Sequence, residues 1–409
     1  MITRRRLLVV GVLVLLLGLP AAVAVRKAAG LRRLGTPVEE VTTAASAPAP
    51  LGAEQVGWQV RADGRIVDVA VVPAVGEVIY VEEVARRRWR ATAVDARTGQ
   101  VRWSNLRGHT GHIEAWAVTD AAVVLAYHHS ASRLAWRTHH AASFEGLDPT
   151  SGKVLWTRHI YNLLGDRPGD YAPTLASPSE NVVYARTEFG VPNAIDTRTG
   201  KTLWERPGLN DCRAHEIVAG PAGVAISHRC PGTKERIELL DPRTGKPLWR
   251  TEISSPSVRL LAVGANSVAL YQGGLVQQII VLGPGGGYAS QTPCACGDGA
   301  SLQGGVTRGT VVVGGGPLGL LGAEGATGTV LWQKPVAGGP VHRVLAQEGY
   351  VHIVSGDGAL IRVDEGTGAM QTLIPGAPGE LDPDAIVVPV GGYLAAGSAK
   401  GFAFTGSGR

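Results

Sequence analysis

The chain has 409 residues, of which 44% are hydrophobic and 18% charged, so it is long enough to bury a large core and too apolar for a disordered protein. Its 56 glycines and 4 phenylalanines favour many tight turns over long helices, and we therefore expect an all-β protein. The formal charge of +5 comes from the first 33 residues, which hold seven Lys and Arg without an acid. The rest of the sequence lacks basic patches interleaved with aromatics, which excludes a nucleic-acid-binding protein.

The amino terminus, residues 1–27, predicts a basic tail followed by a transmembrane anchor or a signal peptide. Residues 7–25 carry no charge and, at about 1.5 Å per helical residue, are just long enough to cross a bilayer core of about 30 Å. Ala22-Val23-Ala24 after Pro20 is typical of a signal-peptide cleavage site, and TRRRLL resembles a twin-arginine export signal, whereas the basic residues that follow favour an uncleaved anchor. Both alternatives place the rest of the chain outside the cytoplasm, and we expect a single-pass protein of the cell membrane.

The next segment, residues 28–55, predicts a flexible spacer. Its central part, TPVEEVTTAASAPAPL, is rich in Ala, Pro, Ser and Thr, a composition typical of linkers. Such a spacer would hold the folded domain, expected over residues 56–409, away from the membrane.

A nine-residue motif recurs through this domain and consists of an acid, two residues, Thr or Ser, Gly, three residues and Trp, as in DARTGQVRW at 95–103. The carboxylate can accept hydrogen bonds from the turn, the glycine supplies a positive φ, and the tryptophan adds a large apolar surface. We interpret these residues as structural rather than catalytic: Asp95, Gly99, Trp103, Asp148, Gly152, Trp156, Asp196, Gly200, Trp204, Asp241, Gly245, Trp249, Gly328 and Trp332.

The spacing of the motif predicts eight units. One unit is hidden, with Gly283 in the place of the acid and Gln291 in that of the tryptophan, and in the last unit Thr405 takes the place of the acid. Four short strands per unit, repeated radially, predict an eight-bladed β-propeller with four-stranded blades. Because the last unit lacks its outer strand and Trp58 precedes the first, we expect the N- and C-terminal strands to share the closing blade.

The motifs resemble the tryptophan-containing repeat of the pyrroloquinoline quinone (PQQ)-like β-propellers, from Trp58 to Arg409. That superfamily includes quinoprotein alcohol dehydrogenases and the BamB-type outer-membrane assembly lipoprotein, so the resemblance implies the fold and leaves the activity open. Its enzymes bind PQQ with a calcium ion, typically beneath a disulfide of two adjacent cysteines. Here Ala295 separates Cys294 from Cys296, so this landmark is missing.

Polar residues recur at one level of the strand expected to be innermost in each unit, where it would line a central channel. One interpretation is that a water-filled channel mouth tolerates polar side chains. The other is a ring that binds a small ligand or a partner's peptide. The candidate residues are Asp68, Glu114, Thr174, His215, Arg259, His342 and Asp384, with Gln303 or Leu302 in the sixth unit.

Four cysteines, an even number, fit an exported protein with disulfides. We prefer to pair Cys212 with Cys230 and Cys294 with Cys296, although four cysteines allow three connectivities. Six of the 11 histidines lie between positions 109 and 140, mostly in an insertion. They could ligate a metal ion such as Zn²⁺, but an exposed loop extension is the preferred interpretation, and no metal site is assigned.

These features predict a membrane-anchored, extracytoplasmic β-propeller that acts as a non-catalytic protein-binding or assembly scaffold at the cell envelope. Its expected partners are envelope or membrane proteins, together with the lipid bilayer through the N-terminal helix, and not nucleic acid. We expect no cofactor. The alternative is a PQQ-dependent quinoprotein dehydrogenase with PQQ and Ca²⁺ at the channel mouth, so the sequence leaves catalysis open while favouring the scaffold.

Overall fold

A computed structural model gives the fold of the parts of the chain that carry the repeats. It describes residues 40–43, 55–85, 88–107, 112–129, 140–162, 180–186, 191–206, 212–232, 234–255, 257–296, 299, 302–307, 309–315, 318–346, 349–374, 386–390, 393–398 and 400–407. The predicted N-terminal helix lies outside these ranges and stays a prediction. Within them, no helix is long and apolar enough to cross a bilayer.

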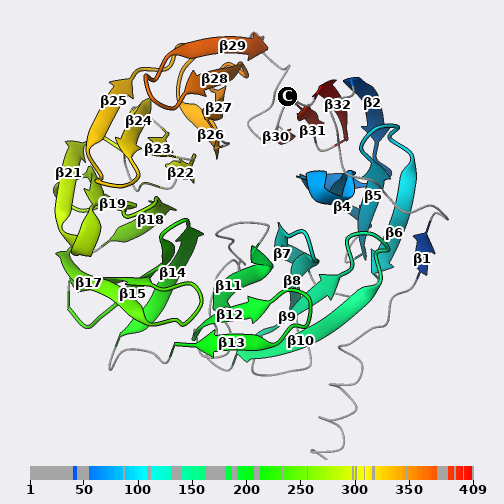
Figure 1. Ribbon diagram of the computed structural model, residues 1–409, viewed down its shortest axis with the longest axis horizontal. Helices are drawn as coiled ribbons and strands as arrows, with labels where there is room; N and C mark the ends of the chain where they lie inside the picture. Colours follow the sequence, from blue (N-terminus) through cyan, green and yellow to red (C-terminus); the bar gives the residue numbers. More distant parts are fainter. Residues whose placement is uncertain are drawn as a thin grey trace, which may run out of the picture.

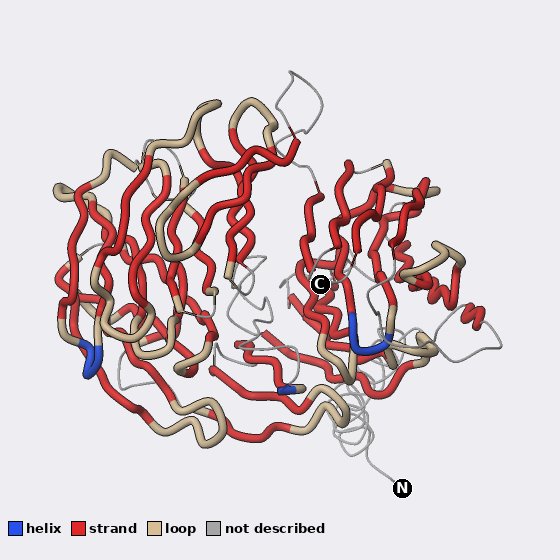
Figure 2. Tube along the Cα trace, turned by 45° about the horizontal axis from the view of Figure 1, so that its top comes forward, coloured by secondary structure: helices blue, strands red, loops and turns tan. Residues whose placement is uncertain are grey.

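The described strands form eight antiparallel sheets that are arranged radially around a central opening (Figure 1). Figure 2 shows the same disc from an inclined direction, with strands dominating and only short helical turns in the described parts, such as η1 (Pro73–Val75) and η4 (Pro284–Gly286). This arrangement confirms the predicted all-β, eight-bladed propeller. Each blade is numbered below in chain order, and its strands are given from the inside outward.

The first four blades hold the strands from residue 65 to residue 254. Blade 1 contains β3 (Arg65–Val72), β4 (Glu77–Ala85), β5 (Arg88–Asp95) and β6 (Val101–Arg107). Blade 2 contains β7 (His112–Val118), β8 (Val123–His129), β9 (His140–Leu147) and β10 (Val154–Asn162). Blade 3 is described by β11 (Val182–Arg186), β12 (Pro192–Asp196) and β13 (Thr202–Glu205). Blade 4 contains β14 (Arg213–Gly220), β15 (Gly223–Arg229), β16 (Lys234–Leu240) and β17 (Pro247–Ser254).

The remaining blades complete the ring. Blade 5 contains β18 (Val258–Val263), β19 (Val268–Gln272), β20 (Gln278–Leu282) and β21 (Tyr288–Pro293). Blade 6 contains β22 (Gln303–Val306), β23 (Thr310–Gly314), β24 (Leu320–Glu324) and β25 (Val330–Lys334). Blade 7 contains β26 (Val341–Ala346), β27 (Tyr350–Ser355), β28 (Leu360–Asp364) and β29 (Met370–Ile374). Blade 8 contains β30 (Ile386–Val390), β31 (Tyr393–Ser398), β32 (Gly401–Ser407) and β2 (Gln55–Arg61).

Blade 8 is closed by both ends of the domain, as the sequence predicts. The N-terminal strand β2 pairs antiparallel with the C-terminal strand β32, and Trp58 lies opposite Phe404 with ring centroids 5.1 Å apart. The indole Nε1 of Trp58 donates to the carbonyl of Ala96 at 2.9 Å, so the clasp also contacts blade 1. β2 therefore covers the outer edge of β32 and completes the four-stranded sheet of this blade.

Part of the predicted spacer also forms a strand. Segment β1 (Glu40–Thr43) pairs antiparallel with β6 and adds a fifth strand to the outer edge of blade 1. Its register places Glu40 opposite Leu106 and Thr43 opposite Trp103. Linker composition did not reveal this strand, because pairing with an existing edge supplies the hydrogen bonds that the segment lacks on its own.

The hydrophobic core lies between blades rather than inside any one of them. One cluster, for example, joins Ile79 and Val81 of blade 1 to Val123 and Leu125 of blade 2, all at most 1% exposed. Both faces of a blade are covered by its neighbours, which explains continuous apolar runs such as GVAIS at the start of β15. Among the described residues, separate clusters of this kind join seven of the eight pairs of neighbouring blades.

The repeated motif ties each blade to the next. Its acid binds the turn, as where Asp95 Oδ1 accepts the amides of Arg97 and Thr98 at 2.9 and 3.1 Å. Its tryptophan donates to a carbonyl in the next blade's turn and covers that turn's glycine, where φ is positive and a Cβ would collide with the indole. This pattern holds for Trp58 on Gly99, Trp103 on Gly152, Trp156 on Gly200, Trp204 on Gly245 and Trp332 on Gly368.

The hidden fifth unit is present, but one predicted position is wrong. In its turn, the Gly283 N–H donates to the carbonyl of Gly287. The corresponding bond in blade 1 runs from the Asp95 N–H to the carbonyl of Gln100, so the turn at Gly283 is one residue shorter. The shorter turn places Ser290, not Gln291, where the other blades have tryptophan, opposite Val281. The Ser290 hydroxyl still donates to Gly328 of the next blade at 3.0 Å.

Candidate functional site

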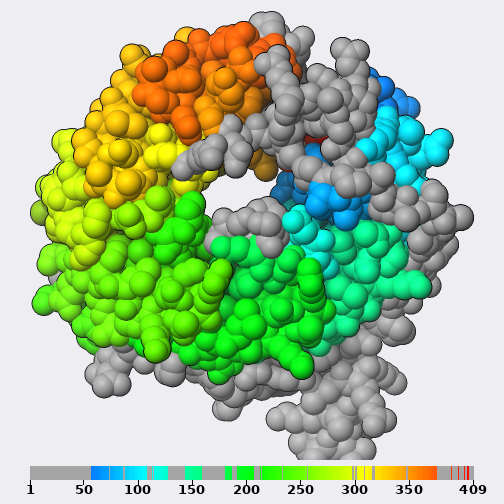
Figure 3. Space-filling view, in the orientation of Figure 1, coloured from blue at the N-terminus to red at the C-terminus, as the bar shows by residue number. Residues whose placement is uncertain are grey.

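The innermost strands surround the opening at the centre of the disc, which the space-filling view shows between the blades (Figure 3). In five of them the pairing register shifts by one residue, which leaves an extra residue as a β-bulge. A bulge disrupts the ladder locally and re-aims side chains. The extra residues are Val67, Glu114, His215, Leu261 and His342.

Three predicted ring residues therefore occupy bulges: Glu114, His215 and His342. They lie on β7, β14 and β26, in blades 2, 4 and 7 (Figure 1). The side chains of His215 and His342 are half-buried, and the side chain of Glu114 lies outside the described parts. Thr174 and Asp384 are also outside the described residues, so a complete ring stays a prediction.

Asp68 follows the bulge of β3 and joins three blades. Its Oδ2 accepts the indole N–H of Trp116, on β7 of blade 2, at 2.8 Å. Its Oδ1 lies 3.7 Å from Nη2 of Arg343, on β26 of blade 7. Since blade 8 lies between blades 7 and 1, this ion pair spans the closing blade at the channel. The Asp68 side chain is 34% exposed, so the pair is solvated and contributes little by itself.

Two further polar side chains fasten neighbouring inner strands. Glu216, directly after the bulge of β14, accepts the amide of Leu260 on β18 at 2.6 Å. Burial raises the pKa of Glu216, and the hydrogen bond from Leu260 opposes that rise. Gln303 of β22 accepts the amide of Val344 at 3.0 Å and donates to the carbonyl of His342 at 2.8 Å. These contacts bind β14 to β18 and β22 to β26.

The residue pattern does not reveal Glu216, and it leaves Gln303 as one of two alternatives. A bulge moves the next residue to the other face of the strand, and no residue pattern announces where the extra residue will be. Arg259 also has a structural contact, because its Nη1 donates at 2.6 Å to the carbonyl of Gly299, in the connection between blades 5 and 6. Several polar positions at this level thus hold the ring of blades together.

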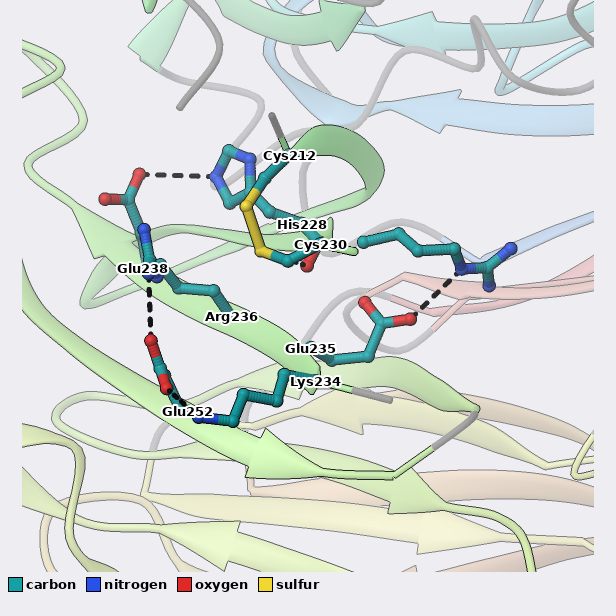
Figure 4. The surroundings of a disulfide bond; sticks show 9 residues. Cys212, His228, Cys230, Lys234, Glu235, Arg236, Glu238 and Glu252 are labelled. Carbon is teal, nitrogen blue, oxygen red and sulfur yellow. Dashed lines mark hydrogen bonds and ion pairs between the residues drawn. A yellow bond between two sulfur atoms is a disulfide. The ribbon is translucent and has the colours of Figure 1, made fainter. Parts of the chain in front are cut away.

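The structure contains both preferred disulfides. Cys212 and Cys230 join the open ends of the β14–β15 hairpin, with a Cα–Cα distance of 4.1 Å (Figure 4). Cys294 bonds to Cys296 in the connection that leaves β21. Cys296 is 5% exposed and packs in the hydrophobic cluster shared by blades 5 and 6. It therefore differs in setting, as well as in spacing, from the paired cysteines that the resemblance associates with PQQ.

A buried charge cluster lies beside the Cys212–Cys230 disulfide (Figure 4). Glu238 and His228 are both fully buried, and His228 Nε2 is 3.3 Å from Glu238 Oε2. Arg250 pairs with Glu238 from β17, and Arg206 of blade 3 approaches it to 3.3 Å. Burial alone would raise the pKa of Glu238, but hydrogen bonds from His228 and Arg206 outweigh it and lower the pKa to about 2. The cluster stabilises the interface between blades 3 and 4 rather than facing the channel.

The described channel residues do not fit PQQ with its calcium ion. Calcium takes several oxygen ligands, usually from carboxylates and carbonyls. Asp68 is held by Trp116 and Arg343, and the carboxylate of Glu216 is held by the amide of Leu260. Across the described residues, no group of three His, Cys, Asp or Glu is placed to hold a metal ion. The side chains of the histidines near 109–140 lie outside that description, so the metal hypothesis for them is untested.

A family comparison agrees with the geometry. The profile described as outer membrane protein assembly factor BamB matches residues 53–220 and 233–372, which is most of the propeller. The chain belongs to this BamB-like family. The two matched segments contain β2 to β14 and then β16 to β28 with the first part of β29, so the family repeat coincides with the blades seen in the structure. No curated protein matches the chain significantly.

Solved structures share the fold of this BamB-like propeller at low sequence identity. The computationally designed Ika8 protein is 17% identical, with a TM-score of 0.57 over 87% of this chain and 100% of that one. The C-terminal WD40 domain of Sif2 is 10% identical, with a TM-score of 0.51 over 89% of this chain and 100% of that one. BamB from Moraxella catarrhalis is 15% identical, with a TM-score of 0.47 over 86% of this chain and 99% of that one. The first two support the fold alone.

Proposed function

We propose that this protein is a non-catalytic protein-binding or assembly scaffold at the cell envelope. The observation that carries the proposal is the family match, since the family is described by an assembly role and the match covers most of the propeller. The structure is compatible with such a role, because a closed ring of blades presents two loop-built faces on a rigid disc. The polar residues described at the channel mostly join neighbouring blades, which favours a structural use of the channel wall.

The proposal includes a membrane location. Residues 1–27 would anchor the chain in the cell membrane, and the propeller would lie on the extracytoplasmic side. Its partners would then be envelope or membrane proteins. The two disulfides support an oxidising location, since such bonds are rare in the cytoplasm.

Cross-linking in intact cells tests the proposal. The full chain is tagged at its C-terminus, cross-linked before lysis and purified from membranes, with residues 1–27 deleted in a control chain. We expect the wild-type chain to co-purify one or a few envelope proteins in near-stoichiometric amounts, and the control to lose membrane retention. Recovery of the wild-type chain alone, without a partner, would contradict the scaffold role.

Accessibility tests the location. Protease added to intact spheroplasts should digest the propeller, because the proposed orientation exposes it outside the membrane. Full protection of the propeller until the membrane is lysed would place it in the cytoplasm and overturn that part of the proposal.

A further inference from the structure

The Cys294–Cys296 disulfide is poorly suited to stabilising the fold. Its two cysteines are separated by 2 positions in the sequence, whereas Cys212 and Cys230 are separated by 18. A disulfide stabilises a fold mainly by restricting the unfolded chain, and a loop as short as this one restricts it least. Breaking the Cys294–Cys296 bond therefore takes little stability from the folded protein.

The two disulfides also differ in what holds their sulfur atoms together. Cys212 and Cys230 lie beside the first residue pair of the β14–β15 ladder, so the sheet keeps their sulfurs close whether or not the bond is present. Residues 294–296 follow the end of β21 and form no strand. Two thiols that are held together less firmly re-form their bond less readily, so we expect Cys294–Cys296 to be the easier disulfide to reduce.

Hydrogen bonds that do not involve sulfur hold the connection on both sides of this pair. The Cys294 N–H donates at 3.0 Å to the carbonyl of Gln277, in the β19–β20 hairpin. The carbonyl of Cys296 accepts the amide of Gly299 at 3.0 Å, and the carbonyl of Gly299 accepts Nη1 of Arg259 at 2.6 Å. Because these contacts do not depend on the S–S bond, the pair can be reduced and re-formed while blade 5 stays folded.

The two cysteines differ in exposure. Cys296 is 5% exposed and packs in the hydrophobic cluster shared by blades 5 and 6, whereas Cys294 is half-buried and Ala295, between them, is exposed. The neighbouring β19–β20 hairpin also reaches the surface, since its Leu275 and Val276 are the two most exposed large hydrophobic residues of the described chain. A thiol from outside therefore reaches the disulfide from the side of Cys294.

We propose that Cys294 and Cys296 form a redox-active pair that exchanges electrons with external dithiols, with Cys294 as the sulfur that is attacked. A thiolate of the dithiol attacks Cys294 Sγ, the S–S bond breaks, and Cys296 leaves as a thiolate that takes up a proton. The second thiol then attacks the dithiol's own sulfur in the mixed disulfide, which releases Cys294 as a thiolate that is protonated in turn. Two electrons and two protons thus pass from the dithiol, which becomes a disulfide, to the cysteine pair. This chemistry goes beyond the scaffold function and does not depend on it.

Equilibration with dithiothreitol tests the pair. The full chain is incubated at a series of ratios of reduced to oxidised dithiothreitol, quenched with acid and alkylated, and the alkylated cysteines are located by mass spectrometry. We expect Cys294 and Cys296 to reach half reduction at a ratio about tenfold lower than Cys212 and Cys230. The melting temperature should stay near its starting value at that ratio, and oxidised dithiothreitol should restore the bond. Half reduction of both disulfides at the same ratio, or unfolding when Cys294–Cys296 is reduced, would overturn the proposal.

Single variants test which sulfur is attacked. Cys296→Ser leaves Cys294 as a thiol, Cys294→Ser leaves Cys296 as a thiol, and each variant is mixed with oxidised glutathione after its melting temperature has shown that it is folded. We expect the glutathione adduct to form about tenfold faster on Cys294 than on Cys296, because buried cysteines react slowly. In wild type, the mixed disulfide trapped with acid during reduction by glutathione should likewise lie on Cys294. Equal rates, or a wild-type adduct on Cys296, would overturn the assignment of Cys294.

A two-cysteine peptide in place of dithiothreitol distinguishes the source of the dithiol. Oxidation of the peptide by the full chain would support protein dithiols as the substrates. Reaction with dithiothreitol but not with the peptide would support small dithiols, and reaction with neither would overturn the proposal.

Discussion

The interface between blades 1 and 2 and the interface between blades 3 and 4 each place an arginine against a buried glutamate, but the pKa values of the two glutamates shift in opposite directions. In the first, Arg107 of blade 1 lies 2.5 Å from Glu145 of blade 2. In the second, Arg206 of blade 3 lies 3.3 Å from Glu238 of blade 4. Both glutamates stand three residues before the acid of the motif, on the third strand of their blade. The difference between Glu145 and Glu238 therefore comes from the residues that surround each glutamate.

Besides its arginine, Glu145 has a tyrosine and a threonine as neighbours, whereas Glu238 has a histidine and a second arginine. Tyr127 and Thr157 donate to Glu145 at 3.4 and 3.1 Å, and burial still prevails and raises the pKa of Glu145. At the same positions, blade 4 has His228 and Arg250, and the pKa of Glu238 is low. Of these two glutamates, the one with more basic neighbours is the one whose pKa is lowered.

The largest expected effect concerns Glu77, which also belongs to the first interface. It is fully buried on β4, and burial raises its pKa to about 8, opposed by Trp103 and Arg102 and reinforced by the negative charges of Asp148 and Asp95. Because the folded pKa lies above the ordinary 4.5, its contribution is complete below pH 4.5 and is lost as the pH rises through 8. Relative to Glu77→Gln, wild type should lose about 5 kcal/mol of unfolding free energy over that window.

Urea unfolding of both chains at pH 4.5, 6 and 8 measures the Glu77 effect. Equal pH slopes for wild type and Glu77→Gln would show that Glu77 is ionised in the folded protein and would remove it from the comparison.

The next effect is a contrast of sign between Glu238 and Glu145. The folded pKa of Glu238 lies below the ordinary value, so its contribution is present above pH 4.5 and disappears as the pH falls towards 2, a change of about 3 kcal/mol. The destabilisation caused by Glu238→Gln should therefore be larger at pH 7 than at pH 3. For Glu145, with a raised pKa, Glu145→Gln should be less damaging at pH 7 than at pH 4. Unfolding free energies of the two variants against wild type measure this contrast, and slopes of the same sign would refute it.

The disulfide beside the second interface should have a comparable effect. Cys212 and Cys230 are separated by 18 positions, and closing a loop of that length stabilises a protein by about 3 kcal/mol. Cys212→Ser with Cys230→Ser should lower the unfolding free energy by that amount. Cys294→Ser with Cys296→Ser is the control, because its loop is only 2 positions long and should matter less. An equal loss from both pairs would contradict the loop-closure explanation.

The smallest effect should be the same at both interfaces. Trp103 donates to Pro149 at 2.6 Å, and Trp204 donates to Pro242 at 2.9 Å, each in the next blade's turn. Replacing either by Phe removes the indole N–H and part of the buried ring, and should cost at least about 1 kcal/mol, the contribution of the hydrogen bond alone. Thermal melts of the two variants measure this, and a several-fold difference between them would show that the motif does not act equivalently around the ring.

Much of the fold could be predicted because the motif recurs at a regular spacing along the sequence. The acid, glycine and tryptophan recur with the period of a blade, so the number of blades and the closing role of Trp58 follow from counting. Ser290 could not be found in this way, because the turn at Gly283 is one residue shorter and the register moves with it. The strand β1 could not be predicted for another reason, since its pairing partner β6 lies elsewhere in the sequence.

The candidate site was less predictable. A count along the inner strands located His215 and His342, but the bulges at these residues decide which neighbours face the channel. Glu216 and the pairing of Asp68 with Arg343 depend on how blades meet in space, which residue spacing does not encode. Leu275 and Val276 are two adjacent apolar residues in a glycine-rich turn. Only their exposure in the folded protein distinguishes them from core residues.

The most direct test of the account separates a scaffold from an enzyme. The full chain is titrated with PQQ in the presence of Ca²⁺, and the melting temperature and dye reduction with alcohols are followed. The account predicts no saturable shift in melting temperature and no dye reduction, because the acids described at the channel are engaged in contacts between blades. A saturable rise in melting temperature with dye-reducing activity would contradict it and establish a quinoprotein enzyme.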